Sequence, residues 1–339
     1  MLRNLALAAG AALFLPIAAN AATAIITDGN VSLGVDNFGQ LNVGGGVRDV
    51  VGQTIVGERW IDPDGVQYES TSHGCLCEGW GVAVNGTTAG YANNSSGTGG
   101  LTQISFDSDA KTAKVVTQIN GTDVFVTHSF ALATETDDLY RVKVTIENKG
   151  TSGVTDVTYR RTMDWDTSPT PFSEYVTIQG TTTTTLLNRS SDNGFSSANP
   201  LANDVTDLNG CGFADFTACG PDDHGAVFDF GFGDLAAGES YSFDIYYGGA
   251  ANKKDALAAL GAVKAELYSF GWSALDPDQN GFSDAGARTP TFIFAFSGVG
   301  GEVIVPEPGA VPLPAAGLML IGGLGGLGAF GAFRKRKAA

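Results

Sequence analysis

Residues 140–147 read YRVKVTIE, and apolar and polar side chains alternate along the whole stretch. Because successive side chains of a β-strand point to opposite faces, this alternation predicts a strand with one buried and one solvated face. The preceding segment, 124–132, has apolar residues on one face, with His128 between them, which we interpret as a core residue. Asn120-Gly121 before that segment is a strong hairpin signal. Together they predict neighbouring antiparallel strands.

The same pattern continues on both sides, where Gly, Thr, Ser, Asn and Asp separate the apolar runs. Asn85-Gly86 predicts another hairpin. Further strands are predicted at 115–119, 154–163, 175–178, 183–187, 226–232, 241–247 and 291–297. The last of these is apolar on both faces, which is typical of the centre of a sheet.

One helix is predicted, with Asn252 as its N-cap. The apolar residues that follow at helical spacing are Leu257, Leu260, Val263, Leu267 and Phe270. We expect the helix to cover one face or one open end of a sandwich. The whole body, 22–302, is predicted to be all-β: one large two-sheet antiparallel sandwich with this accessory helix.

The chain is strongly acidic, with a formal net charge of −17. Without Arg3 and the four basic residues near the C-terminus, 14 Lys and Arg face at most 36 Asp and Glu, a body charge of about −22. Such a surface repels nucleic acid and anionic lipid. It suits exported proteins, cation binding or an acidic matrix.

The chain has four cysteines: Cys75, Cys77, Cys211 and Cys219. An even number in an exported protein predicts structural disulfides. A Cys211–Cys219 bond would close a short loop and leave Cys75 and Cys77 to bridge across one residue, which is uncommon. Pairing between the two clusters is the alternative. The spacing His73-x-Cys75-x-Cys77 is also that of metal ligands.

The segment DPDQNGFSD has oxygen ligands at its positions 1, 3, 5 and 9, namely Asp276, Asp278, Asn280 and Asp284. With glycine at position 6, it matches the first three-quarters of an EF-hand or similar calcium loop. Position 12 is Ala287, so another segment would have to supply the bidentate acid. Two interpretations stay open here, a calcium site and a plain turn.

Arg160, Thr162, Asp164 and Asp166 recur with period two, which places them on one face of a strand. Paired carboxylates on one face could act as acid and base on a glycosidic bond, or hold a metal. The alternative is a surface ion-pair row in which Arg160 neutralises both acids.

Glu78 and Trp80 could join Asp164 and Asp166 in a sugar site. Carboxylates hydrogen-bond hydroxyl groups, and an indole stacks on a sugar ring. The alternative for Trp80 is a place in the core. The sequence has no G-x-S-x-G, no H-E-x-x-H and no nucleotide fingerprint.

Both ends of the chain predict export. Residues 1–21 have one charge, Arg3, an apolar run, and Ala19-Asn20-Ala21 for cleavage by signal peptidase, which is typical of a secretory signal peptide. At the other end, 303–339, a proline-rich spacer precedes the uncharged run 315–333. That run has nearly the ~20 residues that a membrane-spanning helix needs.

The basic end of the chain consists of Arg334, Lys335, Arg336 and Lys337. Basic residues after an apolar run favour the cytoplasmic side. The order of proline motif, glycine-rich apolar helix and basic cluster resembles the PEP-CTERM class of bacterial sorting signals. Pro306-Glu307-Pro308 matches the motif in that name, and the VPLPA variant is matched by Val311, Pro312, Leu313, Pro314 and Ala315.

The resemblance implies recognition by an exosortase, a membrane protease that cuts near the motif and passes the protein to the envelope or an extracellular matrix. The body resembles uncharacterised exported bodies in front of such tails, at 78–81, 159–166 and 240–248. Its architecture also resembles the supersandwich domains of mutarotase-like carbohydrate proteins.

We therefore expect an exported protein that passes through the inner membrane to the cell surface, outer envelope or extracellular matrix. Its role would be structural or in interactions, without enzymatic activity, and calcium would stabilise it. The expected partners are exosortase and signal peptidase during export and extracellular polysaccharide afterwards, but not nucleic acid. One alternative is a carbohydrate-binding or carbohydrate-active domain, such as a mutarotase- or glycosidase-like one. Another is a simple membrane-anchored envelope protein.

Overall fold

The computed structural model describes residues 23–305, and its secondary structure is almost wholly β, with one helix among these residues. The predicted signal peptide (1–21), the sorting motif Val311–Ala315, the helix at 315–333 and the basic residues Arg334–Lys337 lie outside the described residues. Among residues 23–305, helix α1 (Lys253–Val263) is not long and apolar enough to span a membrane.

The strands form three sheets, and every strand pair in them is antiparallel. The nine-stranded sheet has the order β14 (Phe216–Asp222), β12 (Glu174–Gln179), β17 (Leu267–Ser273), β18 (Thr291–Ser297), β16 (Ser240–Ala250), β10 (Leu139–Asn148), β9 (Val124–Leu132), β8 (Ala113–Ile119) and β7 (Leu101–Ser108). The five-stranded sheet has the order β13 (Leu187–Ser191), β15 (His224–Leu235), β11 (Val154–Trp165), β5 (Gly79–Val84) and β6 (Thr88–Asn93).

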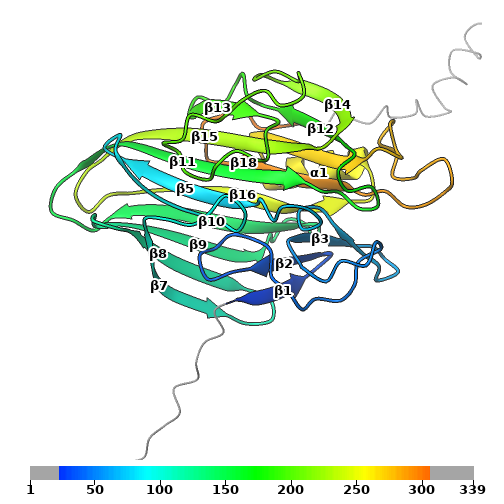
Figure 1. Ribbon diagram of the computed structural model, residues 1–339, viewed down its shortest axis with the longest axis horizontal. Helices are drawn as coiled ribbons and strands as arrows, with labels where there is room; N and C mark the ends of the chain where they lie inside the picture. Colours follow the sequence, from blue (N-terminus) through cyan, green and yellow to red (C-terminus); the bar gives the residue numbers. More distant parts are fainter. Residues whose placement is uncertain (1–22, 306–339) are drawn as a thin grey trace, which may run out of the picture. The chain divides into compact units, whose positions relative to one another are not determined.

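These two sheets face each other as the layers of a sandwich (Figure 1). The four-stranded sheet is formed by β1 (Ala24–Asp28), β2 (Val31–Val35), β3 (Glu58–Ile61) and β4 (Gln67–Glu69), and β2 and β3 contact β16. The predicted antiparallel sandwich is therefore confirmed for the body. The four-stranded sheet was not predicted, because its strands are only three to five residues long.

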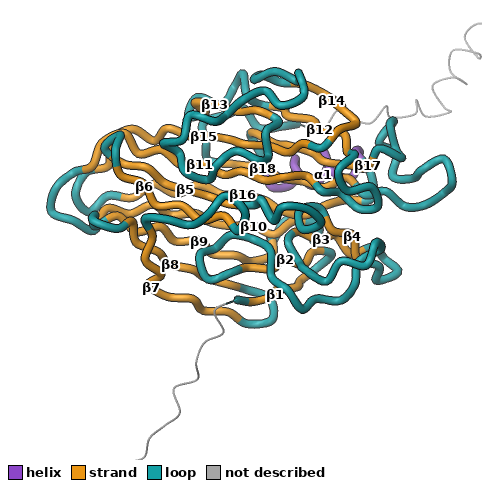
Figure 2. Tube along the Cα trace, viewed as in Figure 1, coloured by secondary structure: helices purple, strands orange, loops and turns teal. Residues whose placement is uncertain are grey.

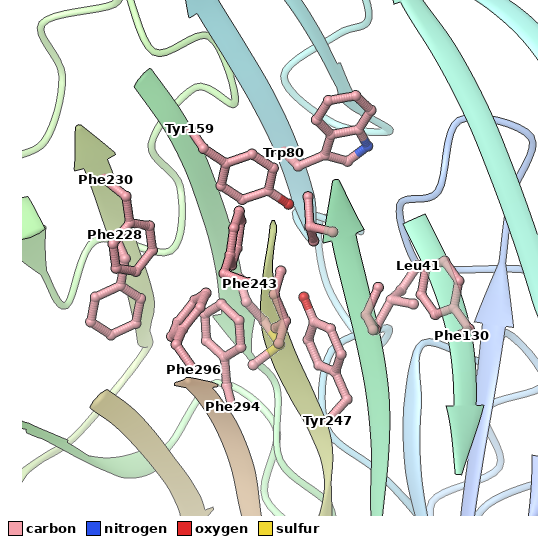
Figure 3. Packing of buried hydrophobic residues seen from close by; sticks show 14 of the residues in the cluster. Leu41, Trp80, Phe130, Tyr159, Phe228, Phe230, Phe243, Tyr247, Phe294 and Phe296 are labelled. Carbon is pink, nitrogen blue, oxygen red and sulfur yellow. The ribbon is translucent and has the colours of Figure 1, made fainter. Parts of the chain in front are cut away.

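Aromatic side chains from both sheets fill the space between the layers (Figure 3). Phe228 of β15 packs edge-on against Phe294 and Phe296 of β18, with ring centroids 5.6 and 5.2 Å apart. Tyr159 of β11 packs in the same way against Phe243 of β16, at 5.0 Å. Such pairs add to the stabilisation that burial of the rings provides.

The strand at 140–147 shows the predicted alternation. Along β10, Val142 and Val144 are buried, and Lys143 between them is exposed. His128 on β9 is fully buried beside them, and its Nε2 lies 3.1 Å from the Tyr159 hydroxyl, as expected of a core histidine. The strand β18 lies between β17 and β16, so its prediction as a central strand is confirmed.

The helix is shorter than the one that the spacing of apolar residues predicted. Helix α1 (Lys253–Val263) begins after the predicted N-cap Asn252 and is followed by the C-cap Lys264, whose φ of 56° is left-handed. The N–H of Ala265 bonds back to the Leu260 carbonyl, which closes the helix in a Schellman turn. Predicted helical residues Leu267 and Phe270 belong instead to β17. The helix covers the outer face of the nine-stranded sheet over β16 and β18 (Figure 2).

The prediction of a strand at 183–187 is also wrong, since β13 begins at Leu187. The hydroxyl groups of Thr183 and Thr184 instead bond to the Gly180 carbonyl, 3.3 and 2.7 Å away, and hold a turn. β-Branched threonines look strand-like in a sequence, but their hydroxyl groups can bond to the backbone locally.

Candidate metal centre

The polar face of β11 is buried rather than exposed. Arg160 has no exposed surface, and its guanidinium pairs with Asp229 (2.6 Å) and Asp204 (2.8 Å). The carbonyl groups of Ser197 and Asn199 also accept from it, so the loop between β13 and β14 covers this face. The predicted surface row in which Arg160 neutralises Asp164 and Asp166 is therefore not formed.

Four carboxylates meet where β11 ends: Asp164, Asp166, Glu174 and Asp223, here called the acidic centre. Asp164 is the penultimate residue of β11, and Glu174 begins β12. Asp223 lies between β14 and β15, and its neighbour Asp222 pairs with Glu174. Carboxylate oxygens of Asp164, Asp166 and Asp223 lie within 4.8 Å of one another.

Most of these oxygens lack hydrogen-bond donors. Within residues 23–305, one buried oxygen on each of the four carboxylates has no partner: Oδ1 of Asp164, Asp166 and Asp223, and Oε2 of Glu174. The side chains of Asp164, Asp166 and Glu174 are at most 2% exposed. The donors that do reach the centre are the backbone N–H groups of Gly74, 2.9 Å from Asp166 Oδ2, and His224, 3.2 Å from Glu174 Oε1.

The Asp164 carboxylate lacks hydrogen-bond donors on both of its oxygens. Its Oδ2 lies 3.3 Å from Sγ of Cys75, but Cys75 is disulfide-bonded and has no S–H to donate. In the described part of the chain, this buried carboxylate therefore accepts no hydrogen bond. A buried carboxylate without a donor or counter-charge costs several kcal/mol, so it must be neutralised by a proton or a cation.

The electrostatics agree with the geometry. Burial, reinforced by the charge of Asp223, raises the pKa of Asp166 to about 7. Burial likewise raises the pKa of Glu174 to about 10, and that of Asp164 well above its usual range, with repulsion from Asp166 adding to the shift. Among residues 23–305, the ion pairs of Lys and Arg involve other acids.

Two histidines flank the acidic centre, but neither has a free ring nitrogen. His73 lies 2.8 Å from both the Asp166 carbonyl and an Asp49 carboxylate oxygen. His224 lies 3.3 Å from Asp192 and 3.1 Å from the Glu174 carbonyl. Both nitrogens of each ring already have a neighbour within 3.3 Å, so these rings are poorly suited to ligate a metal.

The cysteines form two local disulfides, Cys75–Cys77 and Cys211–Cys219. Predicted structural disulfides are thus confirmed, and the alternative pairing between the clusters is not formed. Leu76 has a φ of 52°, a left-handed conformation that turns its two neighbours to the same side. Because both sulfurs are bonded, His73-x-Cys75-x-Cys77 does not offer thiolates to a metal here.

Glu78 and Trp80 lie away from the acidic centre, in the sandwich core. Both are fully buried, and the Trp80 indole donates to the Phe38 carbonyl at 2.8 Å. Glu78 accepts from Arg161, Tyr247 and the backbone of Leu41. The structure therefore unites Asp164 with Asp166 but does not place Glu78 and Trp80 in a groove with them.

The loop 276–284 is held by its own hydrogen bonds. The buried carboxylate of Asp276 accepts from the N–H groups of Asn280 (2.9 Å) and Gly281 (2.8 Å) and from the Thr289 hydroxyl (3.0 Å). The Asn280 amide donates to both Asp278 oxygens, at 2.8 and 3.0 Å. The exposed Asp284 is not joined to them by these bonds. Calcium binding at this loop stays a prediction.

Two members of the acidic centre, Glu174 and Asp223, were not predicted. Each lies more than seven residues from Asp166 and from the other, so no spacing motif connects them. The available signal was an acidic residue at the start of an apolar strand, which also occurs in ordinary turns.

Comparison with models of known protein families gave no match, and a search of curated proteins found none with significant similarity.

Proposed function

We propose that this chain is an exported, non-enzymatic structural or interaction protein that an exosortase sorts to the cell surface or extracellular matrix. The observation that carries the proposal is that both cysteine pairs of the body form disulfides. Such bonds form and persist outside the cytoplasm. The signal at 1–21 and the tail at 303–339 support the same route, through signal peptidase and then exosortase.

The surface chemistry supports an extracellular partner rather than nucleic acid. The body's excess of acidic residues repels polyanions such as DNA and RNA. The role proposed is that of a stable module within exopolysaccharide or biofilm, with extracellular polysaccharide as the partner. Calcium at Asp276, Asp278, Asn280 and Asp284 would add stability at the loop.

Processing of the tail tests the sorting proposal. The mature protein on the surface of its own cells is analysed by mass spectrometry, and we expect Arg334–Lys337 to be absent. A Pro312→Ala/Pro314→Ala variant should keep these residues, whereas the control Pro306→Ala/Pro308→Ala should be processed normally. Basic residues that persist on the wild-type surface form would instead identify a simple membrane anchor.

The carbohydrate-active alternative is tested separately, by a glycan array and turnover assays on the purified chain. The non-enzymatic proposal predicts binding without turnover. Turnover that is lost on Asp164→Asn or Asp166→Asn would replace it with an enzyme.

A further inference from the structure

The acidic centre combines features that an isolated patch of surface acids lacks. Three of its carboxylates, on Asp164, Asp166 and Glu174, are almost completely buried, and each keeps an oxygen without a partner in the described structure. Oxygens of two of them and of Asp223 lie within 4.8 Å of one another. A single ion between them could therefore contact several unpartnered oxygens at once.

We propose that the acidic centre binds one calcium ion through the carboxylates of Asp164, Asp166 and Asp223, with Glu174 beside them. The ion would supply the positive charge that Lys and Arg do not supply to this cluster within residues 23–305. It would also satisfy the oxygens of Asp164, which accept no hydrogen bond there.

The donor set selects the class of ion. All three ligands are carboxylates, which suit hard cations such as calcium, magnesium and manganese. Softer metals would need thiolates or free imidazoles, but Cys75 and Cys77 are oxidised and both nearby histidines are engaged with acceptors. Calcium accepts irregular sets of six to eight oxygens, whereas magnesium demands near-ideal octahedral geometry. We therefore assign calcium.

The backbone around the centre is shaped to enclose it. A Cβ at Gly74 would lie 2.7 Å from Asp166 Oδ2, so glycine lets the backbone approach that carboxylate. A Cβ at Gly194 would lie 2.6 Å from the Asp164 Cα, and one at Gly225 would lie 2.8 Å from it. The loop at Gly194 and the start of β15 at Gly225 thus pack directly on the strand at Asp164. Asp223 is only half-buried and marks the side on which the centre reaches solvent.

Thermal unfolding of the purified full chain tests the site, with calcium chloride added after treatment with EDTA. We expect a rise of about 2–5 °C in Tm at about 10 mM calcium, the range for a weak extracellular site. An Asp164→Asn/Asp166→Asn variant should lose the calcium-induced rise, because two of the proposed ligands become amides. In EDTA, the variant should melt close to the wild type, because an amide has nearly the size and shape of the carboxyl group that it replaces. A general structural role for the two acids would lower the Tm in EDTA as well.

An Asp278→Asn/Asp284→Asn variant is the matched control, since it removes two charges from the other candidate loop. The proposal requires that this control keep the rise. It is overturned if the wild type shows no rise, or if the rise survives in the Asp164→Asn/Asp166→Asn variant. Should that variant not fold, Asp223→Asn takes its place under the same criteria. A response to magnesium that exceeds the response to calcium would overturn the choice of ion.

Discussion

Arg161 and Glu78 form an ion pair in the space between the two layers of the sandwich, with both side chains completely buried. The Tyr247 hydroxyl donates to Glu78 at 2.9 Å, so the nine-stranded sheet also contributes to this pair. Arg161 and Glu78 come from neighbouring strands of the five-stranded sheet, at and just before the pairing of β11 with β5. The pair therefore connects both layers of the sandwich.

Removing one partner of this pair should be strongly destabilising. A Glu78→Gln substitution leaves the Arg161 charge buried without a counter-charge, and we expect a loss of about 3–5 kcal/mol in the free energy of unfolding. Urea denaturation measures it. The matched control is Glu135→Gln, which breaks a surface pair with Arg141 and should cost less than about 1 kcal/mol. Equal losses in the two variants would show that another group compensates the buried Arg161 charge after Glu78 is replaced.

The two disulfides should differ in their contributions. The Cys211–Cys219 bond spans eight residues and the Cys75–Cys77 bond only two, and the longer loop restricts the unfolded chain more. Replacing the first pair by serine should cost about 2–3 kcal/mol, and the second about 1.5 kcal/mol. Peptide mapping without reduction checks the pairing itself. A peptide that links Cys75 or Cys77 to Cys211 or Cys219 would contradict it.

Asp36 should make stability fall as pH rises. Burial raises the pKa of Asp36 to about 6, although hydrogen bonds from Phe38 and Gln40 oppose the shift. The folded protein thus holds this proton more tightly than the unfolded chain, whose pKa is near 3.8. The contribution of Asp36 declines between about pH 4 and pH 6, by on the order of 2–3 kcal/mol.

Comparison with Asp36→Asn isolates this contribution, because other titrating groups are common to both proteins. Unfolding free energies are measured from pH 4 to pH 7, and the variant should gain relative to the wild type as pH rises. If the unfolding free energies of the two proteins changed in parallel with pH, Asp36 would not be the cause of the fall in stability.

Within the loop 276–284, Asp276 should matter without any ion. Its carboxylate accepts from two backbone N–H groups and the Thr289 hydroxyl. An Asp276→Ala substitution leaves these donors unpaired and should cost about 2–3 kcal/mol in EDTA. Asp278→Ala, at an exposed carboxylate, should cost less than about 0.5 kcal/mol under the same conditions. Similar costs would argue that Asp276 does not organise the turn.

Much of the fold could be predicted because local pattern and tertiary structure agree. The alternation at 140–147 and the turns at Asn85-Gly86 and Asn120-Gly121 mark strands and hairpins that the structure contains. Asn85 and Gly86 both have positive φ, which such tight hairpins require. Where local and tertiary preferences differ, prediction fails. Leu267 continues a helical spacing, but it packs in the sandwich core as part of β17.

Only two of the four residues of the acidic centre could be predicted from the sequence. Period two placed Asp164 and Asp166 on one face, but their burial depends on a loop that packs over β11 through Gly194. Glu174 and Asp223 join them because the start of β12 and the β14–β15 turn lie side by side. Such convergence of distant segments leaves no spacing in the sequence. The ion pairs of Arg160 with Asp204 and Asp229 could not be predicted for the same reason.

Anomalous diffraction from crystals grown with calcium would locate an ion in the acidic centre. We predict one calcium peak within about 2.3–2.6 Å of carboxylate oxygens of Asp164, Asp166 and Asp223. A calcium-loaded crystal without a peak there, or with a peak only at the 276–284 loop, would contradict it.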